Sequence, residues 1–260
     1  MTTHQLALGN NTLSYLAAGA GPGIIFLHGA GTNAATNWTA VLEQLAPTNR
    51  VLALNLPGAA ETTWADDTVT LPQLQEAVLT VAAAEGLETF GLVGYSAGAM
   101  VALYLAGSVP ARVTRLVALA PWLTDDARTR FFFGFWGDLL ATDPALFARF
   151  NALTSLSQTT QLQLDAATFA GMAAQASFSP DLLKLIRLNQ SLTVEPVLAA
   201  ITAFTLLVAF TDDQVCPPAY ARQIAGRVTG STLLELAAGH AGPWEAAARL
   251  QPAIVDFFAR

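Results

Sequence analysis

Residues 90–107 read FGLVGYSAGAMVALYLAG, in which a short apolar run passes through a glycine-flanked serine into a helical pattern. The run Phe90–Val93 has the character of a strand buried on both faces. Glycine at Gly94 and Gly98 lets a helix approach a strand closely, because larger side chains would push the two apart. We therefore expect Ser96 on a sharp strand-to-helix turn, with its hydroxyl beside the positive end of a helix dipole where an anionic oxygen is stabilised.

The same alternation of short apolar runs and longer helical patterns extends along most of the chain. The apolar runs are Ile24–Leu27, Val51–Leu56, Phe90–Val93, Val113–Ala120, Phe204–Phe210 and Thr232–Leu236. The helical patterns lie around Trp38–Leu45, Leu71–Glu85, Ala97–Gly107, Pro218–Ala225 and Pro243–Ala259. A hairpin-like stretch, Gln5–Ala17, precedes them. Strands alternating with helices predict an α/β fold with a mainly parallel sheet and helices on both sides.

One segment, residues 122–195, interrupts this alternation because it contains no convincing strand. It reads as helices and loops, which we interpret as a helical cap inserted into a single core, since α/β folds with insertions often reach 260 residues without splitting. An aromatic cluster lies within it: Phe131, Phe132, Phe133, Phe135, Trp136, Phe147 and Phe150. Together these rings favour an apolar wall above a ligand pocket.

The composition predicts a compact protein with a large core, since 53% of the residues are hydrophobic and 12% are charged. Disordered chains are charge-rich and poor in aromatic residues. Twelve Lys and Arg stand against nineteen Asp and Glu, for a net charge of -7. A nucleic-acid partner would need a basic stripe, so none is expected. The acidic balance is interpreted as solvated surface.

Three further features bear on location and cofactors. Met1–Asn11 lacks the basic start and apolar stretch of a secretory signal, so a cytoplasmic location is expected. The most apolar stretch, Val197–Phe210, is shorter than the roughly 18 residues that a membrane span requires. Cys216 is the only cysteine, so an internal disulfide is excluded and no metal site is recognisable. No cofactor is expected.

With its serine turn and strand-helix alternation, the sequence resembles the α/β-hydrolase family over nearly the whole chain except the cap. The resemblance implies a mostly parallel eight-stranded sheet flanked by helices. It implies a core of residues 1–121 and 196–260 with the helical cap at residues 122–195, and a catalytic nucleophile at Ser96.

Two other segments match landmarks of that family in the expected order. His28-Gly29-Ala30-Gly31 follows an apolar run, as the oxyanion loop of the family does. By resemblance, the backbone N–H groups of Ala30 and Ala97 form the oxyanion hole. Gly239-His240-Ala241 follows the last strand and precedes the C-terminal helix, where the family places its catalytic base, so the resemblance assigns that role to His240.

The acid of the triad is sought in residues 210–217, which read FTDDQVCP. Family members usually have here a glycine, two residues, an aspartate and then a proline four positions further on, and counting back from Pro217 gives Asp213. The usual glycine is replaced by Phe210, which leaves the register of this loop open. The alternatives are Asp212 and, as in a minority of relatives whose acid follows an earlier strand, Asp125 or Asp126.

A serine hydroxyl is a poor nucleophile until an imidazole removes its proton, and a carboxylate then holds that imidazole in the correct tautomer. We therefore predict hydrolysis of an ester, lactone or thioester of a moderately apolar small molecule through an acyl-enzyme on Ser96. Serine-bearing relatives also include C–C bond hydrolases, lyases, perhydrolases and cofactor-free oxygenases, and a non-catalytic small-molecule receptor could keep the fold. Analogy of fold does not choose among these.

The substrate pocket is expected beside the predicted triad, with a hydrophobic lining around a few polar groups. The residues assigned to it are His28, Gly29, Tyr95, Trp122, Phe132 and Trp136. The predicted partner is a small apolar ester-like molecule, and the sequence makes no prediction of oligomeric state.

Overall fold

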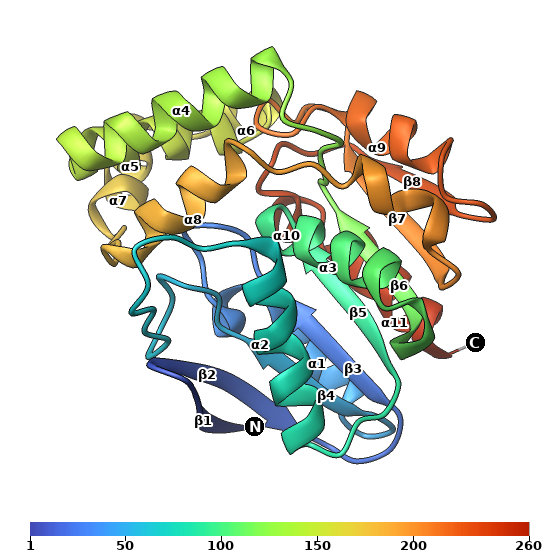
Figure 1. Cartoon of the computed structure of the whole chain (residues 1–260). Helices are drawn as coiled ribbons and strands as arrows, with labels where there is room; N and C mark the ends of the chain where they lie inside the picture. Colours follow the sequence, from blue (N-terminus) through green and yellow to red (C-terminus); the bar gives the residue numbers. More distant parts are fainter. Residues whose placement is uncertain (260) are drawn as a thin grey trace.

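Eight strands form one sheet, in the order β1-β2-β4-β3-β5-β6-β7-β8, in the computed structural model, which describes residues 1–259 (Figure 1). The strands are β1 (Thr2–Leu8), β2 (Asn11–Ala18), β3 (Gly23–Leu27), β4 (Arg50–Leu54), β5 (Phe90–Tyr95), β6 (Val113–Leu119), β7 (Phe204–Phe210) and β8 (Thr232–Leu236). β2 pairs antiparallel with β1 and β4, and every other pairing is parallel. The predicted mostly parallel α/β sheet is confirmed.

Helices cover both faces of the sheet. The core helices are α1 (Ala34–Leu45), α2 (Leu71–Ala84), α3 (Ala97–Ser108), α9 (Pro218–Ala225), α10 (Gly242–Glu245) and α11 (Ala247–Ala259), with the short 3-10 helices η1 (Pro110–Arg112) and η2 (Glu195–Ala200). α1 contacts α11 on one face, and α2 contacts α3 on the other (Figure 1). β3 and β5 are buried at every position, as expected of strands covered on both sides.

Two helix boundaries differ from the sequence prediction for local reasons. α1 begins at Ala34 because the side chain of Asn33 accepts a hydrogen bond from the N–H of Thr36 and caps the helix, which the apolar pattern starting at Trp38 did not indicate. The predicted C-terminal helix is divided into α10 and α11, and the break falls at Ala246.

Between β6 and β7 the described residues form helices and loops without a strand, as predicted. The helices are α4 (Ala127–Thr142), α5 (Pro144–Ser155), α6 (Gln158–Gln163), α7 (Ala166–Ala174) and α8 (Asp181–Asn189). They lie across the carboxyl end of the parallel strands, at the top of Figure 1. The division into a core (residues 1–121 and 196–260) and a cap (residues 122–195) stays a proposal about folding units, and residue 260 lies outside the described part. Within residues 1–259 no helix is long and apolar enough to cross a membrane.

Candidate active site

Ser96 lies on the turn between β5 and α3, in a backbone conformation (φ 54°, ψ -118°) that few non-glycine residues adopt. Its N–H donates to the carbonyl oxygen of Leu119 at 2.8 Å, which fixes the turn against β6. Any Cβ on Gly98 would overlap the carbonyl oxygens of Leu27 and His28, so glycine there permits the close approach of α3. The sharp strand-to-helix turn predicted at Ser96 is therefore present, and the structure adds that its backbone is strained.

His240 lies in the loop between β8 and α10, and its ring bridges two polar side chains. Its Nε2 atom is 3.0 Å from Oγ of Ser96, and its Nδ1 atom is 2.7 Å from Oδ2 of Asp213. All three side chains are buried. An ionised carboxylate only accepts hydrogen bonds, so the network assigns the proton to Nδ1 and leaves Nε2 to accept from the Ser96 hydroxyl.

The structure brings Asp213, among the four acidic candidates, into contact with His240. Oδ1 of Asp213 accepts from the backbone N–H groups of Val215 (2.9 Å) and Cys216 (2.7 Å), which orients its other oxygen toward the ring. Asp212 instead accepts from the N–H of Gln158.

The two earlier carboxylates have other partners. Asp125 forms an ion pair with Arg130 at 2.6 Å. Asp126 caps α4 through the N–H of Thr129 and accepts from the hydroxyl of Tyr220 at 2.7 Å. Both carboxylates are thus used in holding α4.

Phe210, which stands where the family usually has glycine, is fully buried. Its ring lies so close to Gly242 that any side chain at position 242 would overlap it. The large residue at one position is accommodated by the absence of a side chain at the other, and Asp213 still reaches His240.

Two backbone N–H groups lie where the sequence predicts the oxyanion hole. Ala97 is the first residue of α3, whose initial N–H groups have no partner within the helix, and Ala30 follows β3. Among residues 1–259 no protein acceptor is found for either N–H. The residue before Ala30 is glycine because a Cβ on Gly29 would lie 2.8 Å from the ring of Tyr95. The role of both N–H groups as an oxyanion hole stays a proposal.

His28 is buried and has no nitrogen free for a substrate. Its Nδ1 contacts the carbonyl oxygen of Gly29 at 2.7 Å, and its Nε2 accepts from the N–H of Leu56 at 2.8 Å. Burial lowers the pKa of His28 from 6.5 to about 4, against a smaller opposing effect of the Gly29 carbonyl. The neutral ring therefore joins the loop after β3 to the loop after β4.

A cavity of about 600 Å³ lies beside the triad, within the 300 to 1,000 Å³ usual for small-molecule sites. Two of the six residues predicted for the pocket line it, Tyr95 and Trp136, whereas His28 and Gly29 do not. His240 and Ala30, predicted for the triad and the oxyanion hole, also line it. Polar side chains that form hydrogen bonds also line it: Thr32 from the loop before α1, Asn37 from α1, and Asn151 and Ser155 from α5. The wall is thus more polar than the aromatic cluster suggested.

Trp122 and Phe132 are absent from the lining of this cavity. Trp122 is buried and packs on Phe133, with ring centroids 5.0 Å apart. Phe132 contacts Trp136 and Phe150 at centroid distances of 5.4 and 6.4 Å. These rings pack against one another in the helical segment, and a substrate contact with them stays a proposal.

Cys216 lies next to the triad, and burial together with the charge of Asp213 raises the pKa of its thiol well above the usual value. The thiol therefore stays protonated and is no rival to Ser96 as a nucleophile. Among residues 1–259 no group of three His, Cys, Asp or Glu side chains is arranged to hold a metal ion.

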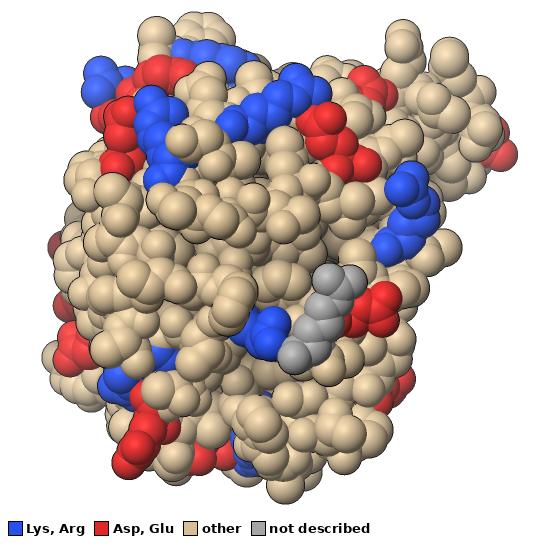
Figure 2. All heavy atoms as spheres, turned by 90° about the vertical axis from the view of Figure 1, so that its right-hand side faces the viewer, with Lys and Arg blue, Asp and Glu red and all other residues tan. Residues whose placement is uncertain are grey.

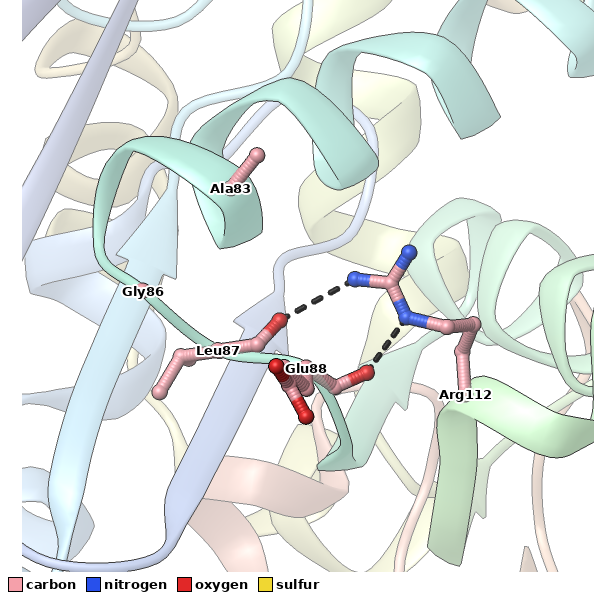
Figure 3. Close-up of a pocket in the computed structure, with 5 residues that line it drawn as sticks. All are labelled: Ala83, Gly86, Leu87, Glu88 and Arg112. Atoms are coloured by element: carbon pink, nitrogen blue, oxygen red, sulfur yellow. Dashed lines mark hydrogen bonds between the residues drawn. The ribbon is translucent and has the colours of Figure 1, made fainter.

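Another hollow lies at the opposite end of the sheet, where β5 and β6 begin (Figure 3). In this hollow the guanidinium group of Arg112 donates to the carbonyl oxygens of Leu87 and Glu88. This contact ties the turn before β5 to η1. On the face shown in Figure 2, basic and acidic side chains alternate without a continuous basic surface, and the absence of a nucleic-acid partner stays a prediction.

The contacts that hold the His240 loop were not predicted from the sequence. The hydroxyl of Tyr95 donates to the carbonyl oxygen of His240 at 2.7 Å, and Oε2 of Glu245 accepts from the N–H of Gly239 at 2.5 Å. Nothing in the sequence indicated that Glu245 holds this loop. An acidic residue in the first turn of a helix is ordinarily explained by its favourable interaction with the helix dipole.

Comparison with known proteins identifies the family. The sequence model of the alpha/beta hydrolase family matches residues 24–251, which is most of the chain. The chain belongs to the alpha/beta hydrolase family.

This α/β hydrolase is similar to several characterised proteins. Pyrrolizixenacetamide deacetylase from Xenorhabdus hominickii is 26% identical over 241 residues, which cover 91% of each chain. An esterase from Mycobacterium tuberculosis is 38% identical over 102 residues, or 38% of this chain and 33% of the relative. A hydrolase from Pseudomonas aeruginosa has a similar structure, with a TM-score of 0.87 and 23% identity over 99% of this chain and 98% of its own. The family and these relatives support an esterase-like hydrolase.

Proposed function

We propose that this α/β hydrolase cleaves an ester, lactone or thioester of a moderately apolar small molecule through an acyl-enzyme on Ser96. The observation that carries the proposal is the chain of contacts from Oγ of Ser96 to Nε2 of His240 (3.0 Å) and from Nδ1 of His240 to Asp213 (2.7 Å). A neutral imidazole in this tautomer can accept the hydroxyl proton as oxygen attacks carbon.

In the proposed first half-reaction, Oγ of Ser96 bonds to the acyl carbon while its proton passes to Nε2 of His240. The carbonyl oxygen becomes an oxyanion and accepts hydrogen bonds from the N–H groups of Ala30 and Ala97, for which no protein acceptor is found within residues 1–259. Donors of this kind contribute about 3 to 4 kcal/mol each to the transition state. The bond to the leaving group then breaks, and the leaving group takes the proton from Nε2.

In the second half-reaction, a water molecule attacks the acyl carbon and gives one proton to Nε2 of His240. The bond to Oγ of Ser96 breaks, the acid leaves, and Nε2 returns its proton to the serine. Asp213 stays ionised throughout and stabilises the imidazolium that forms in each half-reaction. One water is consumed for each ester, and the enzyme is regenerated.

The proposal is tested with p-nitrophenyl esters of short acids, comparing the purified protein with Ser96→Ala. We expect turnover in the first and its near-complete loss in the second, and equal rates would reject the acyl-enzyme. Covalent labelling by a fluorophosphonate tests activation separately, because phosphonylation of Ser96 needs the same base. Labelling that persists undiminished in His240→Ala would remove His240 from the proposed role.

Amide hydrolysis is a second candidate, favoured by the similarity to a deacetylase over 91% of the chain. The same steps apply, but an amine leaves poorly unless Nε2 of His240 protonates it. Comparing p-nitrophenyl acetate with p-nitroacetanilide at matched concentrations separates the two classes. Turnover of the anilide that approaches that of the ester would favour the amide.

The cap and the cellular location also remain proposals. We propose that residues 122–195 act as a cap over the substrate, since their helices lie across the end of the sheet that carries Ser96 (Figure 1). The predicted cytoplasmic location stays a proposal as well.

A further inference from the structure

The carboxylate of Glu245 joins two loops that are far apart in the sequence. Its Oε2 atom accepts from the N–H of Gly239 at 2.5 Å. Its Oε1 atom accepts both from the N–H of Ser157 and from the hydroxyl of Ser157, each at 3.0 Å. One side chain thus connects the residue before His240 to the connection between α5 and α6.

Two backbone contacts support the same connection independently of Glu245. The N–H of Ala241 donates to the carbonyl oxygen of Ser155 at 2.7 Å. Gly239 lies directly against the backbone of Leu156 and Ser157, where a Cβ would be 2.5 Å from the carbonyl carbon of Leu156. The residues on either side of His240 are therefore both held by the Ser155–Ser157 segment.

The loop that carries Asp213 contacts Gln158, the residue that follows Ser157 in the helical segment. Asp212 accepts from the N–H of Gln158, and the next residue is Asp213, which contacts His240. We name the segment Ser155–Gln158 the brace. It contacts both the loop that carries His240 and the loop that carries Asp213.

We propose that Glu245 is a positioning residue for His240, acting by fastening the base loop to the brace. The proposal rests on the proposed roles of Ser96 and His240. Proton transfer needs Nε2 within hydrogen-bond reach of Oγ, and displacement of a reacting group by about 1 Å can cost about 100-fold in rate. With the carboxylate removed, the N–H groups of Gly239 and Ser157 lose their acceptor, and the loop is held by fewer contacts, among them those of Ala241 with Ser155 and of Tyr95 with the His240 carbonyl.

The matched test compares Glu245→Gln with Glu235→Gln. In Glu245→Gln one carboxylate oxygen becomes an amide NH₂, which presents a donor either to the N–H of Gly239 or to the N–H and hydroxyl of Ser157. Glu235 lies on β8, where its carboxylate forms a half-exposed pair with Arg222 (2.7 Å). For Glu245→Gln we expect kcat per labelled active site to fall about 10- to 100-fold, with KM changed less than about threefold. For Glu235→Gln we expect wild-type kcat and KM.

A purely structural role for Glu245 gives a different result. Fluorophosphonate titration counts the folded, labelled sites, and the rate of labelling reports their activation. Slow but complete labelling of Glu245→Gln supports positioning. If Glu245→Gln has fewer labelled sites but a kcat per labelled site within about twofold of the wild-type value, the proposed positioning role is overturned. If Glu245→Gln does not fold, Ser157→Ala decides. It removes the hydroxyl that donates to Glu245 and that also caps α6 through the N–H of Thr160. We expect a roughly fivefold fall in kcat at unchanged KM, and an unchanged kcat overturns the proposal.

A readout without substrate separates this proposal from the proposed function. We expect the Gly239 amide hydrogen to exchange slowly in the wild-type protein and at least about tenfold faster in Glu245→Gln, since one lost hydrogen bond and local opening remove its protection. Equal exchange rates of the Gly239 amide hydrogen in both proteins would overturn the proposal that Glu245 fastens this loop to the brace. Failure of the wild-type protein to cleave esters or react with fluorophosphonate, with exchange as expected, would instead reject the proposed function.

Discussion

Acidification is expected to destabilise this protein through His28. Burial lowers the pKa of that histidine from 6.5 to about 4, so between these values the unfolded chain binds more protons than the folded one. The stabilisation from the neutral ring is complete above pH 6.5 and is lost as the pH falls toward 4. Each pKa unit corresponds to about 1.4 kcal/mol, which gives about 3 kcal/mol in full and about 2 kcal/mol between pH 7 and pH 5.

The assay is urea unfolding followed by tryptophan fluorescence at several pH values between about 7 and 5, for wild type, His28→Gln and His4→Gln. His28→Gln loses the bridge between Gly29 and Leu56 and starts less stable. Its free energy of unfolding is nevertheless expected to fall about 2 kcal/mol less across this range, because it has no buried imidazole to protonate. His4→Gln serves as a matched histidine substitution at a partly exposed position.

The comparison of slopes isolates His28 because wild type and His28→Gln contain the same carboxylates. Parallel curves for wild type and His28→Gln would refute the reasoning. Parallel curves would mean that the His28 ring binds a proton as easily in the folded protein as in the unfolded chain. That result would disagree with the burial of the ring and with the N–H of Leu56 that donates to Nε2.

Three other outcomes are expected. Gly98→Ala forces α3 away from the carbonyl oxygen of Leu27 and is expected to cost about 1 to 3 kcal/mol in denaturant unfolding, with a loss of kcat; unchanged stability would contradict the close approach. Asp213→Asn is expected to lower kcat by about 10⁴-fold, and Asp212→Asn by less than about tenfold because only a contact with Gln158 changes; equal losses would contradict the assignment. Cys216 is expected to resist iodoacetamide near pH 8 until the protein is unfolded, since burial raises the pKa of its thiol, and rapid labelling of the native protein would contradict this.

Local patterns accounted for the sheet and for the positions of Ser96 and His240. A buried parallel strand is apolar along its length, and a tight strand-to-helix turn needs small residues such as Gly94 and Gly98, so both leave a signature within a few residues. The carboxyl ends of parallel strands meet at one edge, which is why loops distant in sequence could be expected to converge.

Other features depend on contacts that no local pattern records. The choice of Asp213 over Asp212 depends on which carboxylate faces the imidazole, and Phe210 fits only because Gly242, in another loop, has no side chain. The role of Glu245 depends on where Ser157 returns to the core. The aromatic residues of the helical segment gave a hydrophobic pattern that suits a packed interior as well as a ligand wall, and most of them pack together.

The most direct test of the central claim is mass spectrometry of the protein quenched in acid soon after mixing with a p-nitrophenyl ester. The proposed mechanism predicts a mass increase equal to the acyl group, located on the peptide that contains Ser96 and absent from Ser96→Ala. Steady hydrolysis with no adduct in wild type, or an adduct on another residue that persists in Ser96→Ala, would contradict it.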